Sequence, residues 1–207
     1  MSKPTTITII LGPAAPTEWD QADRIQGSAD LPPAAGADDA ARAVIESAAA
    51  PGPQLVLSAP DEASRSVARR LAKAVSAKVK TVGGLAEPGL GLWEGLARQA
   101  CIERYPTAFK QWRANPAGVQ PPEGEPFTGA VERIISSFAR AVDKSGKSSV
   151  AVVARPAALA IIARHIKGEP ILADWSSAPG PGVISVETTI RDVKATPVLR
   201  ATAEAAP

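Results

Sequence analysis

The chain has 207 residues, a length that favours one domain of ordinary size. Hydrophobic residues make up 45% of it and charged residues 21%, which is typical of a globular protein that buries a core. The formal net charge is only +2, and no segment is densely lysine- or arginine-rich, so the composition gives no support for binding nucleic acid or a membrane surface.

The single cysteine, Cys101, excludes a disulfide within the chain and a zinc site built from cysteines. No stretch approaches the ~18 apolar residues that a membrane-spanning helix needs. The first residues contain neither the apolar core nor the cleavage pattern of a signal peptide. We therefore expect a soluble, cytoplasmic protein.

The first predicted strand covers residues 5–11, a continuous β-branched and apolar run of the kind that is buried on both faces of a sheet. Gly12 and Pro13 end it. Apolar spacing and breaker residues predict the remaining elements in chain order: helix 38–49, strand 54–57, a helix starting near Pro60, strand 79–82, helices 96–104, 107–113 and 128–144, strand 149–154, helix 156–167 and strand 183–193.

Strands that alternate with helices predict an α/β fold: a three-layer sandwich with a mostly parallel central sheet and helices on both faces. We expect one domain over residues 1–194. The helical, loop-rich segment 85–126 is interpreted as an insertion over the strand ends and the pocket. Residues 195–207 are small and polar and are predicted to form a flexible tail.

Five short motifs lie between these elements. They are Thr17-Glu18-Trp19-Asp20, Arg24-Ile25-Gln26-Gly27, Ser58-Ala59-Pro60, Leu85-Ala86-Glu87 followed by Trp93-Glu94-Gly95-Leu96, and the strand from Val150 to Ala154. In this order they resemble the T-x-W-N, R-x-Q-G, S-S-P, L-x-E with W-E-G, and V-x-V-V-S segments of the histidine phosphatase superfamily. The resemblance covers residues 5–193 and implies the phosphoglycerate mutase-like fold.

In that family a histidine after the first strand attacks phosphorus, while two arginines and a second histidine hold the phosphoryl oxygens. The resemblance places the first arginine and the nucleophile at Pro13 and Ala14, the second arginine at Ala63 and the second histidine at Arg155. Glu87 keeps the position of the general acid. Alanine cannot form a phosphoenzyme, so no catalytic residue is expected and these five positions are interpreted as a vestigial pocket.

Two arginines are candidates for binding an anion. Arg155 lies at the predicted carboxyl edge of the sheet, where α/β proteins bind their ligands. Glu87 is expected beside it and could neutralise it in a closed ion pair. Arg24 could bind an anion at the pocket rim or anchor a loop. No cluster of metal ligands is present in the sequence, so neither a metal nor another cofactor is expected.

Other residues that could carry chemistry have simpler explanations. His165 is the only histidine and falls near the end of a predicted helix, where the dipole favours it, rather than near the pocket. Trp93 and Trp112 are expected to be packing residues rather than a ligand platform. Cys101 is expected to be a small core residue.

Three functional hypotheses follow. The first is a catalytically inactive pseudophosphatase that acts as a binding, scaffolding or regulatory module. The second is a phosphatase or mutase with an altered mechanism that uses Glu87, Arg155, a water nucleophile and a metal. The third is a binder of a small phosphorylated metabolite. The expected partner is thus a protein or a small phosphorylated ligand, and a homodimer is compatible with a fold that often dimerises.

Overall fold

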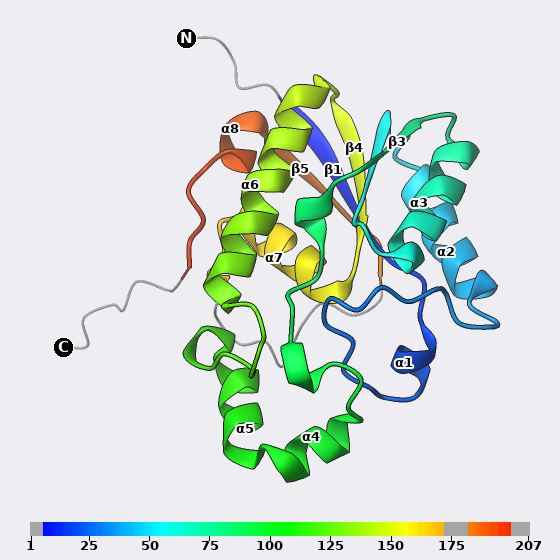
Figure 1. The fold of residues 1–207 in the computed structure, drawn as a ribbon. Coiled ribbons are helices and arrows are strands. Elements are labelled where there is room, and N and C mark those ends of the chain that lie inside the picture. Colours follow the sequence, from blue (N-terminus) through cyan, green and yellow to red (C-terminus); the bar gives the residue numbers. More distant parts are fainter. Residues whose placement is uncertain (1–5, 172–181, 200–207) are drawn as a thin grey trace.

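The computed structural model describes residues 6–171 and 182–199. Five strands form one sheet in the order β3-β2-β4-β1-β5 (Figure 1). Neighbouring strands pair in parallel except β5, which runs antiparallel to β1. The strands are β1 (Thr6–Pro13), β2 (Leu55–Ser58), β3 (Lys78–Thr81), β4 (Ser149–Ala154) and β5 (Ile184–Thr189).

Helices connect the strands and form an additional unit beyond the carboxyl ends of the parallel strands, where α1, α4 and α5 lie (Figure 1). The α-helices are α1 (Glu18–Gln21), α2 (Asp38–Ala49), α3 (Glu62–Ala74), α4 (Arg98–Arg104), α5 (Pro106–Ala114), α6 (Phe127–Ser145), α7 (Pro156–Lys167) and α8 (Ile190–Val193). Three short 3-10 helices are η1 (Gly83–Leu85), η2 (Gly91–Trp93) and η3 (Pro116–Gly118).

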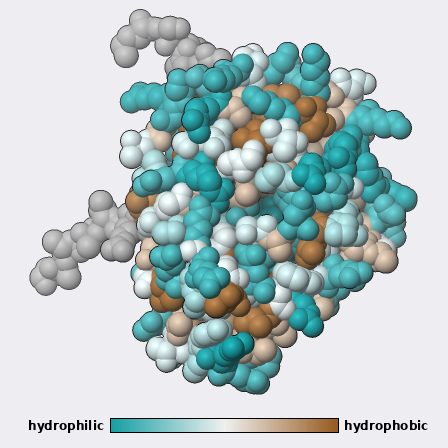
Figure 2. Space-filling model, viewed as in Figure 1, coloured by the Kyte–Doolittle hydropathy of each residue, from teal (hydrophilic) through white to brown (hydrophobic). Residues whose placement is uncertain are grey.

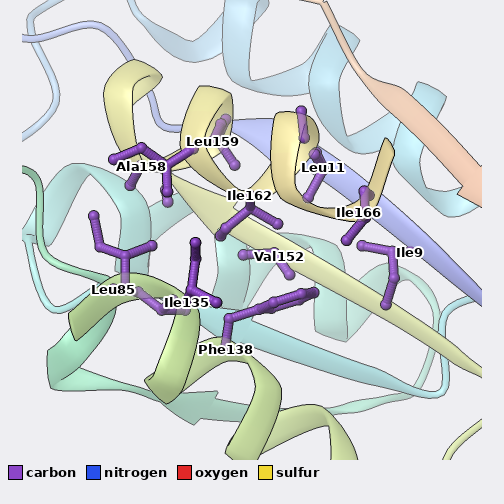
Figure 3. Packing of buried hydrophobic residues seen from close by; sticks show 14 of the residues in the cluster. Ile9, Leu11, Leu85, Ile135, Phe138, Val152, Ala158, Leu159, Ile162 and Ile166 are labelled. Atoms are coloured by element: carbon purple, nitrogen blue, oxygen red, sulfur yellow. The ribbon is translucent and has the colours of Figure 1, made fainter. Parts of the chain in front are cut away.

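Successive side chains of a buried strand point to opposite faces of the sheet, so the strands contribute to two cores, one on each face. Ile9 and Leu11 of β1 pack with α6 and α7, and Figure 3 shows them with Phe138 and Ile162. Ile10, between them, packs on the opposite face with residues of α2 and α3. The α/β sandwich predicted from the sequence is therefore confirmed. On the face shown in Figure 2, hydrophobic residues form small separate groups among hydrophilic ones.

The last strand is shorter than predicted for 183–193. It ends at Thr189, whose hydroxyl accepts the backbone N–H of Asp192 at 3.1 Å and caps the short helix α8. Residues 195–199, assigned to the tail from the sequence, contact the domain, since the carbonyl of Val198 accepts the N–H of Ile171 at 2.9 Å. The rest of the predicted tail, 200–207, lies outside the described residues.

The segment 85–126 contains a small core of its own. Trp93 is fully buried, and its ring centroid lies 5.7 Å from that of Phe109 and 5.8 Å from that of Trp112. Cys101 is buried in the same cluster. The predictions that both tryptophans and Cys101 are packing residues are confirmed.

His165 also has a structural role. It is buried, and its Nε2 lies 3.0 Å from the carbonyl oxygen of Val193, so it links α7 to the end of α8. In the part of the chain that the structure describes, no helix is both long and apolar enough to cross a membrane.

Candidate functional site

The site lies where β1 and β4 end side by side. Pro13 is the register partner of Ala154, and the N–H of Ala14 donates to the Ala154 carbonyl at 3.0 Å. Arg155 follows Ala154 directly and precedes Pro156, which begins α7. The two positions that the family resemblance assigns to histidines, Ala14 and Arg155, are therefore brought together at the carboxyl edge of the sheet.

The guanidinium group of Arg155 is held by Asp20 of α1. Its two Nη atoms donate to the two carboxylate oxygens of Asp20 at 2.9 and 2.8 Å, and its side chain is only 8% exposed. This is a bidentate charge-assisted pair, the strongest hydrogen-bonded geometry available to arginine. Two of the five N–H groups of Arg155 are thus used within the chain, and its charge is balanced by Asp20.

Asp20 is positioned by a capping box at the start of α1, within the motif that resembles the T-x-W-N segment of the family. Thr17 donates to its Oδ2 from both the backbone N–H and the hydroxyl, at 2.7 and 2.8 Å, and the Thr17 hydroxyl accepts the Asp20 N–H. Burial alone would raise the pKa of Asp20, but the hydrogen bonds from Arg155 and Thr17 outweigh it and hold the pKa below its usual value.

The expected ion pair between Arg155 and Glu87 is wrong. Glu87 instead accepts the backbone N–H groups of Ala157 and Ala158 at 2.8 and 2.9 Å, one on each carboxylate oxygen. Its carboxylate therefore caps the N-terminus of α7, where free N–H groups and the helix dipole favour negative charge. Asp20 takes the place beside the guanidinium. The sequence signal was present, because Asp20 stands where the family motif has asparagine.

The environment of Glu87 opposes its ionisation. Burial raises its pKa to about 7, although the two backbone hydrogen bonds and the positive charge of Arg155 act in the opposite direction. Such a pKa would suit a general acid, but both oxygens are occupied in holding α7, so the carboxyl group is fixed in a structural role.

Two pockets meet at Arg155. The larger has a volume of about 550 Å³ and is lined mainly by apolar residues, among them Pro13, Ala14, Val44 and Leu159. The smaller, of about 140 Å³, has charged residues in its lining, which consists of Gly27, Ser28, Ala29, Asp30, Pro60, Asp61, Ala86, Glu87 and Arg155. The vestigial space inferred from the sequence is therefore open on both sides of the Arg155 side chain.

Two predicted positions fall outside these pockets. Ala63 lies in the first turn of α3, is 0% exposed and lines neither pocket. Arg24 also lines neither pocket. It is exposed and its Nη1 donates to the carbonyl of Gly95 at 2.6 Å, which supports its role as a loop anchor.

Sequence reasoning missed the acidic residues of the smaller pocket. Asp61 caps α3 by accepting the N–H of Ser64 at 2.9 Å, and Asp30 accepts the N–H of Glu62 at 2.6 Å. The only signal for Asp61 was its place in the first turn of a predicted helix, and none marked Asp30 as its neighbour. Within residues 6–171 and 182–199, no group of three or more histidine, cysteine, aspartate or glutamate residues is arranged to hold a metal ion.

The sheet order, the two helical layers and the pockets at the carboxyl ends of β1 and β4 define a phosphoglycerate mutase-like α/β protein. The chain belongs to the histidine phosphatase superfamily, branch 1, whose family model matches residues 14–195. The family resemblance drawn from the sequence is confirmed.

Individual relatives are distant. Phosphoserine phosphatase 1 of Hydrogenobacter thermophilus is 21% identical over 170 residues, which cover 82% of this chain and 81% of that protein. The solved structure of the alpha-ribazole phosphatase from Shigella flexneri matches with a TM-score of 0.74 and 17% identity, over 88% of this chain and 94% of the other. A mycobacterial glucosyl-3-phosphoglycerate phosphatase matches with a TM-score of 0.72 and 20% identity, over 88% and 89%. At this level of identity the structural matches establish the fold alone.

Proposed function

We propose that this chain is a catalytically inactive histidine-phosphatase-like protein that acts as a binding, scaffolding or regulatory module. One observation carries the proposal. At the position of the family nucleophile the chain has Ala14, and the one cation beside it, Arg155, gives both of its Nη atoms to Asp20. The position of the family nucleophile therefore offers no atom that can attack phosphorus, and the positive charge of Arg155 is balanced by Asp20.

The pairing of Arg155 with Asp20 makes binding of a phosphate to Arg155 less favourable. A hydrogen bond to a charged group contributes about 1.5–3 kcal/mol. A phosphate that took over the bidentate position on Arg155 would have to displace two such bonds from Asp20, and one bound at the other N–H groups would lie close to the negative charge of that carboxylate. This competition argues against both an altered phosphatase mechanism and the use of Arg155 as a phosphate anchor.

The relatives act on phosphate esters according to their names, which concern phosphoserine, alpha-ribazole phosphate and glucosyl-3-phosphoglycerate. This chain could carry out the same chemistry only if it had the reacting residues of the family. Ala14 and Arg155 depart from the family motif at both histidine positions, and Pro13 and Ala63 at both arginine positions. Loss of all four groups supports a changed role for the pocket.

The purified protein is expected to show no hydrolysis of p-nitrophenyl phosphate or phosphoserine above a blank, because no nucleophile is present. The assay measures phosphate release at several pH values, with and without magnesium, manganese and zinc, beside an active family phosphatase as the positive control. Turnover that purifies with the wild-type protein and disappears in Glu87→Gln would contradict the proposal and point to a carboxylate-dependent mechanism.

A further inference from the structure

One side of α6 carries a row of basic and hydroxyl side chains. The row runs at spacings of four, three and four residues, which places its members on one line along the helix: Arg133, Ser137, Arg140 and Lys144. Within the described residues, the ion pairs of α6 involve Arg133 and Asp143. Arg140 and Lys144 are exposed and have no acidic partner there.

The acidic residues of α6 do not neutralise this row. Asp143 is the acid nearest to Arg140 along the helix, and it pairs with Lys194 at the end of α8 at 3.0 Å. Glu132 is more than two turns before Arg140. Arg140 itself bonds only neutral groups, since its Nε donates to the carbonyl of Ser136 at 3.1 Å and its Nη2 to the hydroxyl of Ser137 at 3.5 Å.

The edge strand β3 contributes two lysines on the same face of the sheet. β3 is the last strand of the sheet, and β2 is its only strand neighbour. Lys78 and Lys80 are exposed, and in the parallel register they are opposite Leu55 and Leu57. Both leucines pack in the core that α6 shares. Because paired residues of neighbouring strands point to the same face, the lysines project on the face that α6 covers.

The chain after β3 brings these lysines to the basic row of α6. It runs from β3 towards α6 (Figure 1), and Nη1 of Arg133 donates to the carbonyl of Gly84 at 3.0 Å. Ser137 lies so close that a Cβ at Gly84 would clash with its hydroxyl. From this contact α6 leads to the start of β4, which lies at the same edge of the sheet as the start of β3. Lys80 is at most about 14 Å of chain from Gly84, and Lys144 is about 10 Å along the helix from Ser137.

A basic face is therefore formed by Lys78, Lys80, Arg140 and Lys144. None of the four has an ion pair among the described residues. Together they exceed the formal net charge of +2 of the whole chain, so positive charge is concentrated at this place. Lysines on an edge strand protect it against pairing with other chains. That protection accounts for the lysines of β3 and not for two cations on a helix.

The composition of the basic face favours an acidic protein segment as its occupant. A second copy of the chain would bring like charges together. Binding in a membrane surface requires an exposed apolar group beside the cations, and the exposed large hydrophobic residues of the described chain lie elsewhere: Leu92, Ile102 and Val198. Single-stranded nucleic acid stacks its bases on exposed aromatic rings, and Phe138 of α6 is buried.

We propose that the basic face docks an acidic segment of a partner protein, whose carboxylates pair with the two lysines of β3 and the two cations of α6. This inference rests on the proposed function as a binding module and names the surface and the charge of the partner. The four residues line neither pocket, so docking does not require a ligand at Arg155. Because the Debye length is about 8 Å at physiological ionic strength, the carboxylates have to reach contact distance, and added salt should weaken binding.

Fluorescence anisotropy with a labelled peptide that alternates glutamate and serine tests the proposal. The matched peptide has glutamine in place of glutamate. We expect saturable, salt-sensitive binding of the acidic peptide only. The double variants Arg140→Gln with Lys144→Gln and Lys78→Gln with Lys80→Gln should each raise its Kd about three- to tenfold. The two variants change different elements, so either one tests the face if the other folds poorly, and thermal melting checks the fold of both.

Lys110→Gln with Arg113→Gln is the matched control. Both residues are exposed on α5, in the unit beyond the carboxyl ends of the strands (Figure 1), so this variant removes the same charge elsewhere and should bind like wild type. Equal Kd values for wild type and both variants of the basic face, or an equal loss in the α5 control, would overturn the proposal.

Anionic lipid vesicles and a single-stranded oligonucleotide, titrated in the same way, test the other classes of partner. Tighter binding of either one than of the acidic peptide would overturn the choice of a protein partner. Any of these contrary results, combined with no phosphatase turnover, would leave the inactive-module proposal standing. Turnover in a protein that still binds the acidic peptide through the basic face would contradict the inactive-module proposal alone.

Discussion

Replacing Arg155 with alanine is expected to lower the free energy of unfolding by about 2–4 kcal/mol. The substitution leaves the carboxylate of Asp20, whose side chain is 32% exposed, without its cation, and removes two charge-assisted hydrogen bonds. Because water reaches part of Asp20, the loss stays below that of a fully buried pair. Urea denaturation and thermal melting measure it, and the melting temperature should fall by roughly 5–15 °C.

Arg42→Ala is the matched control for this experiment. Arg42 is 65% exposed and lies 4.0 Å from Asp39, a surface pair of the kind that contributes about 0–1 kcal/mol. A double-mutant cycle with Asp20→Asn separates the pairing from the packing of the arginine stem. If Arg155→Ala and Arg42→Ala proved equally mild, the Asp20–Arg155 pair would contribute no more to stability than a surface ion pair.

The second large effect is a dependence of stability on pH that comes from Glu87. The pKa of Glu87 is about 7 in the folded protein against an ordinary value of 4.5, so between these pH values the folded state keeps a proton that the unfolded chain releases. Its contribution to stability is complete below pH 4.5, declines as pH rises, and is lost above pH 7. The limit is about 3 kcal/mol, reduced to the extent that water reaches this part-buried carboxyl.

Glu87→Gln isolates that contribution because the amide does not titrate. The difference in free energy of unfolding between wild type and Glu87→Gln, measured by denaturant titration at pH 4.5, 6 and 8, should shift in favour of the variant as pH rises. Groups with lowered pKa values, such as Asp20, act alike in both proteins and cancel. A difference that stays constant across this range would show that Glu87 keeps an ordinary pKa in the fold.

The Asp20–Arg155 pair gives a physical account of how the site changed. The family motif has asparagine at the position of Asp20 and histidine at that of Arg155, and both departures occur in this chain. The structure joins them at 2.8 and 2.9 Å. An arginine introduced alone would be a buried, unpaired cation, which is strongly unfavourable, so the acidic partner at Asp20 is what makes Arg155 compatible with the fold.

The sequence by itself determined the fold class and the residue types at the positions of the family motifs. Ile10 and Val152 lie in continuous apolar runs. Such runs are recognised from neighbouring residues along the chain alone, so these strands are predictable without a structure. The same holds for Ala14, since the absence of a nucleophile is a fact of residue type. Collinear motifs then identified the family.

Only the tertiary structure decided which charged residues and backbone groups bond to one another. Asp20 and Arg155 are 135 positions apart, Glu87 and the start of α7 about half that, and Asp30 approaches Asp61 from a different loop. Hydrogen bonds extend over only about 3 Å. Deciding whether Asp20 or Glu87 pairs with Arg155 therefore requires their positions in space, which no local sequence pattern encodes. For the same reason, the grouping of Asp30, Asp61 and Glu87 around the smaller pocket became visible only once the fold had brought those residues together.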